Sequence, residues 1–216
     1  MRKKVIAFSI WGDNPIYNIG AIRNADLAIE IYKDWECWFY IGQSTPQSTI
    51  SQLNKRKNCK IILQPEEGNW SGMFWRFYPA SDPNVEVMVS RDADSRLNTR
   101  EFFAVKQWMQ SNKNFHIMRD HPYHQTEILG GMWGCKFPAL KNMKTLINEY
   151  TKGEFWQVDQ NFLREKVYPL IKNDTIVHDE FFERQSFPTA REPNRFVGQA
   201  FDEHDNLLNP EHTNYI

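Results

Sequence analysis

The stretch EVMVSRDADSRLN, residues 86–98, joins a strand-like apolar pattern to a cluster of charges. Valine alternates with other residues from Val85 to Ser90, and Asp92 and Asp94 then follow one residue apart. Two carboxylates at this spacing repel by roughly 1 kcal/mol in water and by several in a drier cleft. A cation is therefore expected beside them, either Arg91, Arg96 or a metal ion. The alternative is a plain turn, because Asp and Ser are common where strands end.

Composition sets the broad class of this 216-residue chain. Hydrophobic residues make up 41% and charged residues 25%, which is typical of one large globular domain or two small ones. The formal net charge of -1 provides no basic field, so no nucleic-acid partner is predicted. Aromatic residues make up 14%, more than a core requires, and flat rings also suit a carbohydrate or nucleobase site.

Cysteines and apolar runs indicate where the protein works. The three cysteines are scattered, which argues against a disulfide framework and a zinc knuckle. The N-terminal apolar run is too short for a signal peptide and lacks a small-residue cleavage site. No stretch approaches the roughly 20 apolar residues of a membrane span. We expect a soluble cytoplasmic protein without an integral membrane segment, in the host cytoplasm if the gene is viral.

Strand and helix patterns alternate along the chain, which predicts an α/β fold with a largely parallel sheet flanked by helices. Ligands of such sheets bind beyond the carboxyl ends of the strands, where Asp92 and Asp94 lie. We expect a single domain over 1–205, followed by a polar tail over 206–216 that is a candidate linker to a further domain. The expected strands are 4–10, 36–42, 59–64, 85–90, 115–118, 130–135 and, as strand or loop, 175–182; the expected helices are 21–32, 45–56, 69–82, 99–111, 138–150 and 156–169, with a loop over 11–20.

An ordered set of motifs resembles the glycosyltransferases of the GT-A fold. An N-terminal strand, the helix MFWRFYPASD, a further strand and then D-x-D follow the family order, as do EILGGMWGC, WQVDQNFLR and VHDE. Up to about Asp205 the chain resembles small chlorovirus-type glycosyltransferase domains, which share stretches such as FSIWGDNP, MRDHPYH and VDQNFLR. The resemblance implies a GT-A-like mixed, mostly parallel sheet with a Rossmann-like nucleotide-binding half. It also implies transfer of a sugar from a nucleotide-sugar, UDP-sugar preferred, to a hydroxyl of a glycan or glycoconjugate.

The resemblance also implies a Mn2+ or Mg2+ site. Asp94 is expected to bind the metal directly, and Asp92 to bind it directly, through water, or to contact the ribose. His178 in VHDE matches the late metal-binding histidine of the family and would favour Mn2+; the alternative is a satisfied histidine at the sheet edge. The expected contacts to the nucleotide-sugar are Ser9, Ile10, Trp11, Arg23, Arg76, Asp92, Ala93, Asp94, Gly130, Gly131 and Gln160. Core packing for Trp11, a surface ion pair for Arg76 and a solvated helix face for Arg23 are the alternatives.

Asp159 is the first candidate for catalysis. In inverting members a carboxylate near this position is the base that deprotonates the acceptor hydroxyl, and in retaining members it contacts the donor sugar. Its structural alternative is a helix N-cap. Glu127, just before Gly130 and Gly131, is the rival base, and RDHPYH over 119–124 is read as a donor-sugar or acceptor loop, or as plain loop structure.

Three other functions compete with glycosyl transfer. A strand followed by D-x-D-S also resembles the aspartyl nucleophile motif of phosphatase-type hydrolases, although those enzymes place it on the first strand. A sugar-nucleotide-forming nucleotidyltransferase would share the fold, but its Gly-rich first loop is absent. A non-catalytic carbohydrate-binding module is the third alternative, and the intact D-x-D pair argues against it.

Overall fold

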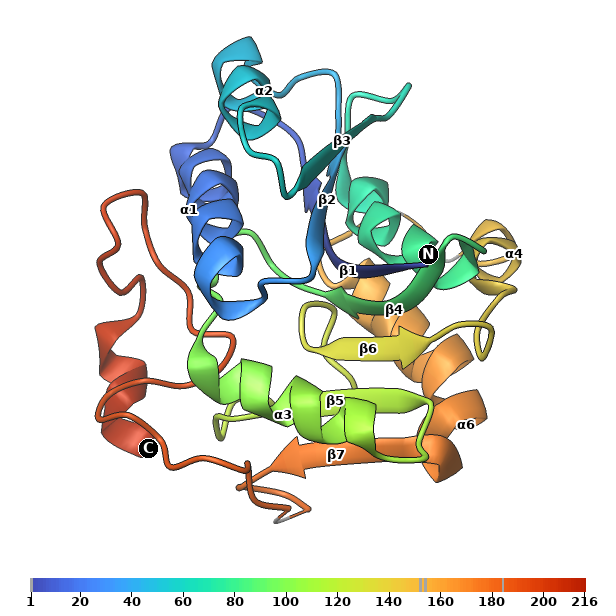
Figure 1. The fold of residues 1–216 in the computed structure, drawn as a ribbon, viewed down its shortest axis with the longest axis vertical. Helices are drawn as coiled ribbons and strands as arrows, with labels where there is room; N and C mark the ends of the chain where they lie inside the picture. Colours follow the sequence, from blue (N-terminus) through green and yellow to red (C-terminus); the bar gives the residue numbers. More distant parts are fainter. Residues whose placement is uncertain (1, 152, 154, 184) are drawn as a thin grey trace.

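The computed structural model describes residues 2–151, 153, 155–183 and 185–216. Strands and helices alternate through the first half of the chain, and shorter helical segments dominate the second half (Figure 1). The strands are β1 Lys3–Ile10, β2 Glu36–Ile41, β3 Cys59–Leu63, β4 Val85–Ser90, β5 Phe115–Arg119, β6 Trp133–Lys136 and β7 Thr175–Asp179. The helices are α1 Pro15–Ile31, α2 Gln47–Asn54, α3 Thr99–Gln110, α4 Met143–Asn148, α5 Val158–Phe162 and α6 Tyr168–Ile171, with the 3-10 helices η1 Trp70–Ser81, η3 Lys172–Asp174 and η4 Pro210–Tyr215 and the π turn η2 Leu163–Val167.

The described strands form one sheet in the order β3-β2-β1-β4-β6-β5-β7. Only β6 runs antiparallel to its neighbours, so the sheet is mixed and mostly parallel, as predicted. The chain leaves β1 towards β2 on one side and returns to β4 on the other. This reversal of strand order opens a crevice beyond the carboxyl ends of β1 and β4.

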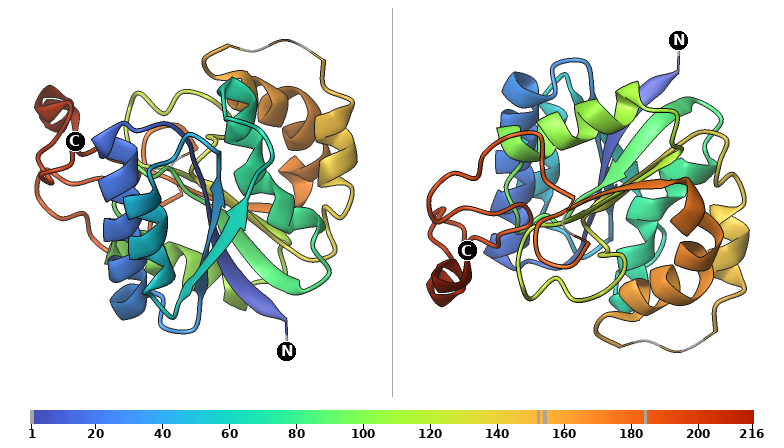
Figure 2. Two further views of the ribbon diagram at one scale, coloured as in Figure 1. Left: turned by 90° about the horizontal axis from the view of Figure 1, so that it is seen from above. Right: turned by 90° about the horizontal axis from the view of Figure 1, so that it is seen from below.

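Each face of the sheet is covered by helices, as Figure 2 shows from above and below. Successive residues of a strand point to opposite faces, so Val5 and Ala7 of β1 pack under η1, α5 and α6, whereas Ile6, Phe8 and Ile10 pack under α1 and α3. Both cores are fully buried, which holds the ends of β1 and β4 firmly at the crevice.

Two helix starts differ from the sequence prediction. Helix α1 begins at Pro15, not at residue 21, because Asn14 caps it by accepting the backbone N–H of Ile16 and Pro15 suits the first helical position. The predicted helix over 138–150 is wrong in its first part, since α4 spans only Met143–Asn148 and follows a series of turns. A proline favours a helix start but does not enforce one.

The last third of the chain is held by local and long-range contacts. The helical run from Val158 continues through Pro169 to Ile171, and β7 then pairs with β5 in parallel register. The expected polar tail ends in η4, which packs on the loop after β5 through a hydrogen bond from His121 Nε2 to the carbonyl of His212 (2.9 Å). No helix in the described part of the chain is long and apolar enough to cross a membrane.

Candidate functional site

A cavity of about 630 Å³, called the main cavity below, lies at the crevice beyond β1 and β4. It is lined by residues from the β1–α1 connection, η1, the segment after β4, the segment before β6, the start of α5 and the C-terminal segment. Eleven of the residues proposed from the sequence line it: Ser9, Ile10, Trp11, Arg76, Asp92, Ala93, Asp94, Gly130, Gly131, Asp159 and Gln160.

Arg76 stands at the centre of these residues and links two of the carboxylates. Its guanidinium donates through Nη1 to Asp92 and through Nη2 to Asp159 Oδ2 at 2.7 Å. Burial opposes the charge on Arg76, but Asp92 and Asp159 outweigh it and raise the pKa of Arg76 above its ordinary value. The alternative of a surface ion pair is therefore wrong, since Arg76 is a buried cation shared by two acids of the site.

The two carboxylate oxygens of the buried Asp159 differ in their partners. Its Oδ2 accepts from Arg76, whereas its Oδ1 is buried without a hydrogen-bond partner among the described residues. Burial raises the pKa of Asp159, although Arg76 opposes this shift. A buried oxygen without a partner is costly, which makes a ligand hydroxyl a fitting partner in this cavity.

The carboxylates of Asp92 and Asp94 fit a hard cation. Burial, with the charge of Asp92 as the next cause, raises the pKa of Asp94 to about 6. The side chain of Asp92 is 44% exposed and lines the main cavity. A destabilised carboxylate is one that a bound cation would stabilise. Among the described residues no cluster of three or more His, Cys, Asp or Glu side chains could hold a metal. One or two carboxylates completed by phosphate oxygens and water is a common Mg2+ arrangement.

Helix α1 holds the D-x-D segment in place from behind. Asn24 is fully buried and donates to the carbonyls of Ala93 (3.3 Å) and Ser95 (2.8 Å), while its Oδ1 accepts from the backbone N–H of Leu97 (2.9 Å). A side chain at Gly20 would lie 2.0 Å from the carbonyl oxygen of Ala93. The carboxylates are therefore presented by a loop fixed through its backbone.

Gly130 and Gly131 leave room for the charged groups. A Cβ at Gly131 would lie 2.0 Å from Asp92 Oδ2, and one at Gly130 would lie 2.5 Å from both Asp159 Oδ2 and Arg76 Nη2. The Gly-Gly pair thus allows the arginine and both acids to approach the backbone closely. This close approach is the physical reason for two glycines here.

Trp11 lies in a slot made by three glycines. A Cβ added at Gly42, Gly68 or Gly72 would lie 2.9, 2.4 or 3.1 Å, respectively, from the side chain of Trp11. Trp75 packs edge-on against Trp11, with ring centroids 6.1 Å apart. The ring lines the main cavity in this fixed position. It is placed where an aromatic face can stack on a planar group.

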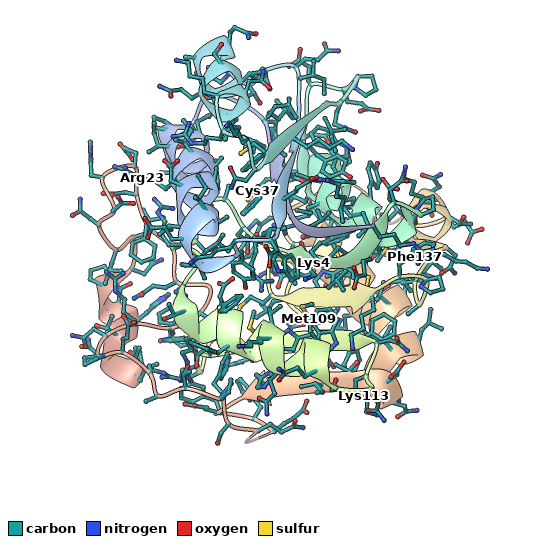
Figure 3. The ribbon with its side chains drawn as sticks, in the orientation of Figure 1. Lys4, Arg23, Cys37, Met109, Lys113 and Phe137 are labelled. Atoms are coloured by element: carbon teal, nitrogen blue, oxygen red, sulfur yellow. The ribbon has the colours of Figure 1, made fainter. Side chains whose placement is uncertain are left out.

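Three proposed residues lie outside the main cavity. Arg23 points from α1 towards the C-terminal segment (Figure 3), and its Nε pairs with Asp205 Oδ2 at 3.2 Å. Glu127 is exposed and does not line the cavity. The proposed base at Glu127 and nucleotide contact at Arg23 are therefore not supported by this arrangement.

His178 is also placed elsewhere. It is buried in β7, where its Nδ1 faces His116 Nε2 (2.8 Å) and its Nε2 faces Gln107 Oε1 (2.9 Å). Both ring nitrogens thus have partners, and the alternative of a satisfied histidine describes the structure. The metal role proposed for His178 is corrected accordingly, because no free ring nitrogen reaches the carboxylates.

Arg91 does not compensate the D-x-D pair either. It points to the opposite face of the sheet, where its Nε donates to Glu101 Oε1 at 3.0 Å, and Tyr32 shares that carboxylate at 3.0 Å. Arg96 donates hydrogen bonds to the carbonyls of the segment, including that of Ser95 (3.0 Å), and its charge is a minor cause that lowers the pKa of Asp94. The cation beside Asp92 is Arg76, which lies 16 positions earlier in the chain.

Several cavity residues escaped the sequence analysis. Tyr17 lies near the D-x-D pair, since burial and then Asp94 and Asp92 raise the pKa of its phenol; the early start of α1 at Pro15 would have indicated it. His124 belongs to the loop that was read as a sugar or acceptor loop, but had no assigned role. Gly198 and Ala200 lie in a polar segment without any pattern, so no signal could have found them. The further lining residues missed are Gly12, Asp13, Asn14, Trp70, Met73, Leu129, Met132, Trp156 and Gln157.

Comparisons with known proteins show the fold. No protein-family model and no curated protein sequence matches the chain. Among solved structures, a glycosyltransferase involved in the glycosylation of the major capsid of PBCV-1 is similar, with a TM-score of 0.55, 17% identity and 82% of each chain covered. The chain therefore has the GT-A-like fold of glycosyltransferases.

Two more distant structures share this fold. Glucosyl-3-phosphoglycerate synthase from Mycobacterium tuberculosis, in complex with Mn2+, UDP and glucosyl-3-phosphoglycerate, has a TM-score of 0.54 and 10% identity over 88% of this chain and 72% of that one. The 4-diphosphocytidyl-2C-methyl-D-erythritol synthase of Anaerococcus prevotii has a TM-score of 0.50 and 11% identity over 88% and 92%. The fold is thus compatible with more than one nucleotide chemistry.

Proposed function

We propose that the protein is a metal-dependent glycosyltransferase that moves a sugar from a nucleotide-diphosphate sugar to a hydroxyl of a glycan acceptor. The observation that carries the proposal is the convergence of Asp92, Asp94, Arg76 and Asp159 in one cavity beyond β1 and β4. Asp92 and Asp94 can hold a cation that suits a diphosphate leaving group. Asp159, which shares Arg76 with Asp92, has an oxygen suited to a reacting hydroxyl.

Each residue has a distinct task in this proposal. Asp94 and Asp92 would hold Mn2+ or Mg2+, which supplies positive charge to the departing diphosphate. Trp11, fixed in its glycine slot, stacks on the base, and UDP is the preferred nucleotide because a UDP complex with Mn2+ has this fold. Arg76 keeps Asp92 and Asp159 in place as a buried cation.

Asp159 acts on the sugar side of the site. As a base, its free Oδ1 takes the proton of the acceptor hydroxyl, and the raised pKa improves its match to neutral pH. As a sugar contact, the same oxygen accepts from a donor hydroxyl. The Arg76 bond to Oδ2 orients the carboxylate for either task.

Nucleotidyl transfer is the second candidate, because a synthase of that class shares the fold. The Gly-rich first loop that such an enzyme needs is absent, because residues 11–20 contain two glycines that are far apart, Gly12 and Gly20. A phosphatase-type site is less suitable, since no lysine lines the described part of the main cavity. A binding module without catalysis would not need a buried acid with a free oxygen.

The decisive experiment is a screen of nucleotide-sugars with Mn2+, with Mg2+ and with a chelator. We expect metal-dependent hydrolysis of one donor and a metal-dependent rise in melting temperature with the matching nucleotide. Release of pyrophosphate from a nucleoside triphosphate and a sugar phosphate would instead indicate nucleotidyl transfer. Release of inorganic phosphate, in place of free sugar and nucleoside diphosphate, would indicate the hydrolase.

Two variants test the assigned roles. Asp94→Asn should lower turnover about 100-fold or more, since changes to the partners of metal ligands alone cost about 10–100-fold. Glu86→Gln on the exposed side of β4 should be neutral. For Asp159→Asn, lost transfer with intact donor affinity indicates the base, and weakened donor affinity indicates a sugar contact. Normal metal-dependent turnover in a folded Asp94→Asn protein would refute the metal assignment.

A further inference from the structure

A second, smaller cavity adjoins the main cavity and has no role in the donor site described above. This side cavity has a volume of about 170 Å³. It shares His124, Gly198 and Ala200 with the main cavity, so a ligand in one lies next to a ligand in the other. Its remaining lining residues are His121, Tyr123, Phe196, Gln199, Asn209 and His212.

The described lining of the side cavity carries no Asp, Glu, Lys or Arg. Two of its histidines are held neutral by their surroundings. Burial is the first cause that lowers the pKa of His124, to about 3, and it also lowers the pKa of His121. An anionic ligand such as a sugar phosphate would need a cation here, so the chemistry favours an uncharged ligand.

Directed hydrogen-bonding groups are nevertheless present. The Nδ1 of His124 accepts the backbone N–H of Asp120 at 3.0 Å, so the single proton of this neutral ring resides on Nε2, which is a donor. Gln199 is only 4% exposed, and its Oε1 is buried without a partner in the described residues. A donor and an acceptor are therefore available for hydroxyl groups.

Aromatic faces complete the lining. Tyr123 is 52% exposed, although its ring packs against three other rings. The centroid distances are 5.0 Å to His121, 4.9 Å to His212 and 5.4 Å to Tyr215. These contacts hold the phenol ring while one side stays open. A rigid, half-exposed aromatic ring is suited to stacking on the apolar face of a sugar.

We infer that the side cavity is an acceptor subsite that binds one neutral sugar ring, with Tyr123 as its stacking surface and Gln199 as a hydroxyl acceptor. The inference rests on the proposed glycosyl transfer and adds the class of acceptor, an uncharged glycan. The shared residues His124, Gly198 and Ala200 place this ring beside the donor.

Saturation-transfer NMR on the full chain tests binding without catalysis. The probes are the methyl α-glycosides of glucose, mannose and galactose, with glucose 6-phosphate as the charged comparison. We expect a signal from at least one neutral glycoside. The affinity of that glycoside should fall about tenfold in Tyr123→Ala. It should also fall in Gln199→Met, which keeps the shape of the side chain and tests the subsite even if Tyr123→Ala does not fold.

The matched control is Phe103→Ala, which removes an exposed aromatic ring from α3 that lines neither cavity and should bind like the parent. In transfer assays with the glycoside that binds, Tyr123→Ala should lower the ratio of transfer to donor hydrolysis. No signal from any neutral glycoside, an affinity equal to the parent's in both cavity variants, or tighter binding of glucose 6-phosphate than of the neutral glycosides would overturn the inference. Absence of donor hydrolysis in the parent would instead refute the proposed function.

Discussion

The main cavity has two walls that are held in different ways. On one side, α1 fixes the D-x-D segment through the buried amide of Asn24 and the close approach of Gly20. On the other side, the C-terminal segment is fixed by Asp120, which is fully buried and accepts from Arg100 (3.0 Å), Arg191 (2.6 Å) and the backbone N–H of Val197 (2.9 Å). We call these the α1 wall and the C-terminal wall.

The α1 wall is thus held by neutral hydrogen bonds, whereas the C-terminal wall is held by ion pairs. Neutral hydrogen bonds in a packed helix do not depend on pH or salt, whereas a buried carboxylate with two arginines depends on every partner staying charged. All six histidines of the chain also lie from residue 116 to residue 212, in the second half of the sequence with Asp120. We therefore expect the hydrogen bonds of the α1 wall to be insensitive to pH and salt, whereas the C-terminal wall should respond to both. The Asp94 carboxylate that the α1 wall presents is the exception, because its pKa is raised to about 6.

Asp120→Asn should have the largest effect on stability. It removes the buried carboxylate that Arg100 and Arg191 share and leaves their charges to the partly exposed Glu180, which we expect to cost about 3 kcal/mol, the lower end of the range for a broken buried pair. Urea unfolding measures the loss. The control Asp26→Asn breaks an exposed pair with Arg56 and should cost less than about 1 kcal/mol; equal losses in the two variants would remove the distinction between buried and exposed pairs.

Asn24→Ala should be the next most severe change. The N–H of Leu97 and the carbonyl of Ser95 lose their partner, which we expect to cost about 2–3 kcal/mol together. Donor affinity should fall as the carboxylates lose their fixed position. Asn58→Ala, which removes one bond to the carbonyl of Ala25, is the control. A loss that depends strongly on salt would contradict the description of the α1 wall as neutral.

Acidification should destabilise the side of the C-terminal wall. Burial lowers the pKa of His116 well below its ordinary value and that of His178 to about 4. On acidification these two histidines therefore bind protons in the unfolded chain before they do in the folded one. Their contribution to the free energy of unfolding is complete at pH 7 and is lost as the pH falls below about 6.5 towards 4. The slope is at most about 1.4 kcal/mol per pH unit for each histidine.

Asp94 opposes this trend, because its raised pKa of about 6 makes the folded state take up a proton first on acidification. Asp159, whose pKa is also raised, acts in the same direction as Asp94. Four histidines have lowered pKa values, since His121 and His124 join His116 and His178, and they outnumber these two carboxyls. Thermal unfolding across this range should show a shallower slope for His178→Gln than for the parent, and an unchanged slope for the exposed His204→Gln. Identical slopes in all three proteins would exclude the buried pair as the source.

Gly72→Ala should have the smallest effect. Its Cβ would lie 3.1 Å from the ring of Trp11, so the ring must shift by a few tenths of an ångström. Overpacking of this size costs about 1 kcal/mol of stability. A loss of stacking free energy of the same size, caused by the shifted ring, would lower donor affinity about fivefold. Titration with UDP and Mn2+ measures it, and Trp11→Ala sets the upper limit. Unchanged affinity in both variants would mean that Trp11 does not contact the nucleotide.

The local pattern of the sequence was sufficient to predict the sheet and the D-x-D segment. Alternating valines from Val85 and the charges after Ser90 indicated a buried strand with acids at its carboxyl end, because side-chain period and the edge of a parallel sheet are local properties. Asp94, Asp92, Arg76 and Asp159 were proposed from the order of motifs, and the structure brings them together. The predicted start of α1 missed the capping role of Asn14.

Only the tertiary structure decided which charges meet. Arg91 is adjacent to Asp92 in sequence, yet the strand alternation turns it to the opposite face and to Glu101. His178 lies near the carboxyl end of its strand, close to where the acids follow theirs, yet β7 is two places beyond β6 in the sheet and His178 pairs with His116. Gly198 and Ala200 reach the cavity because Asp120 holds Val197 from 77 positions away. Such partners are set by strand order and packing, which a local pattern does not contain.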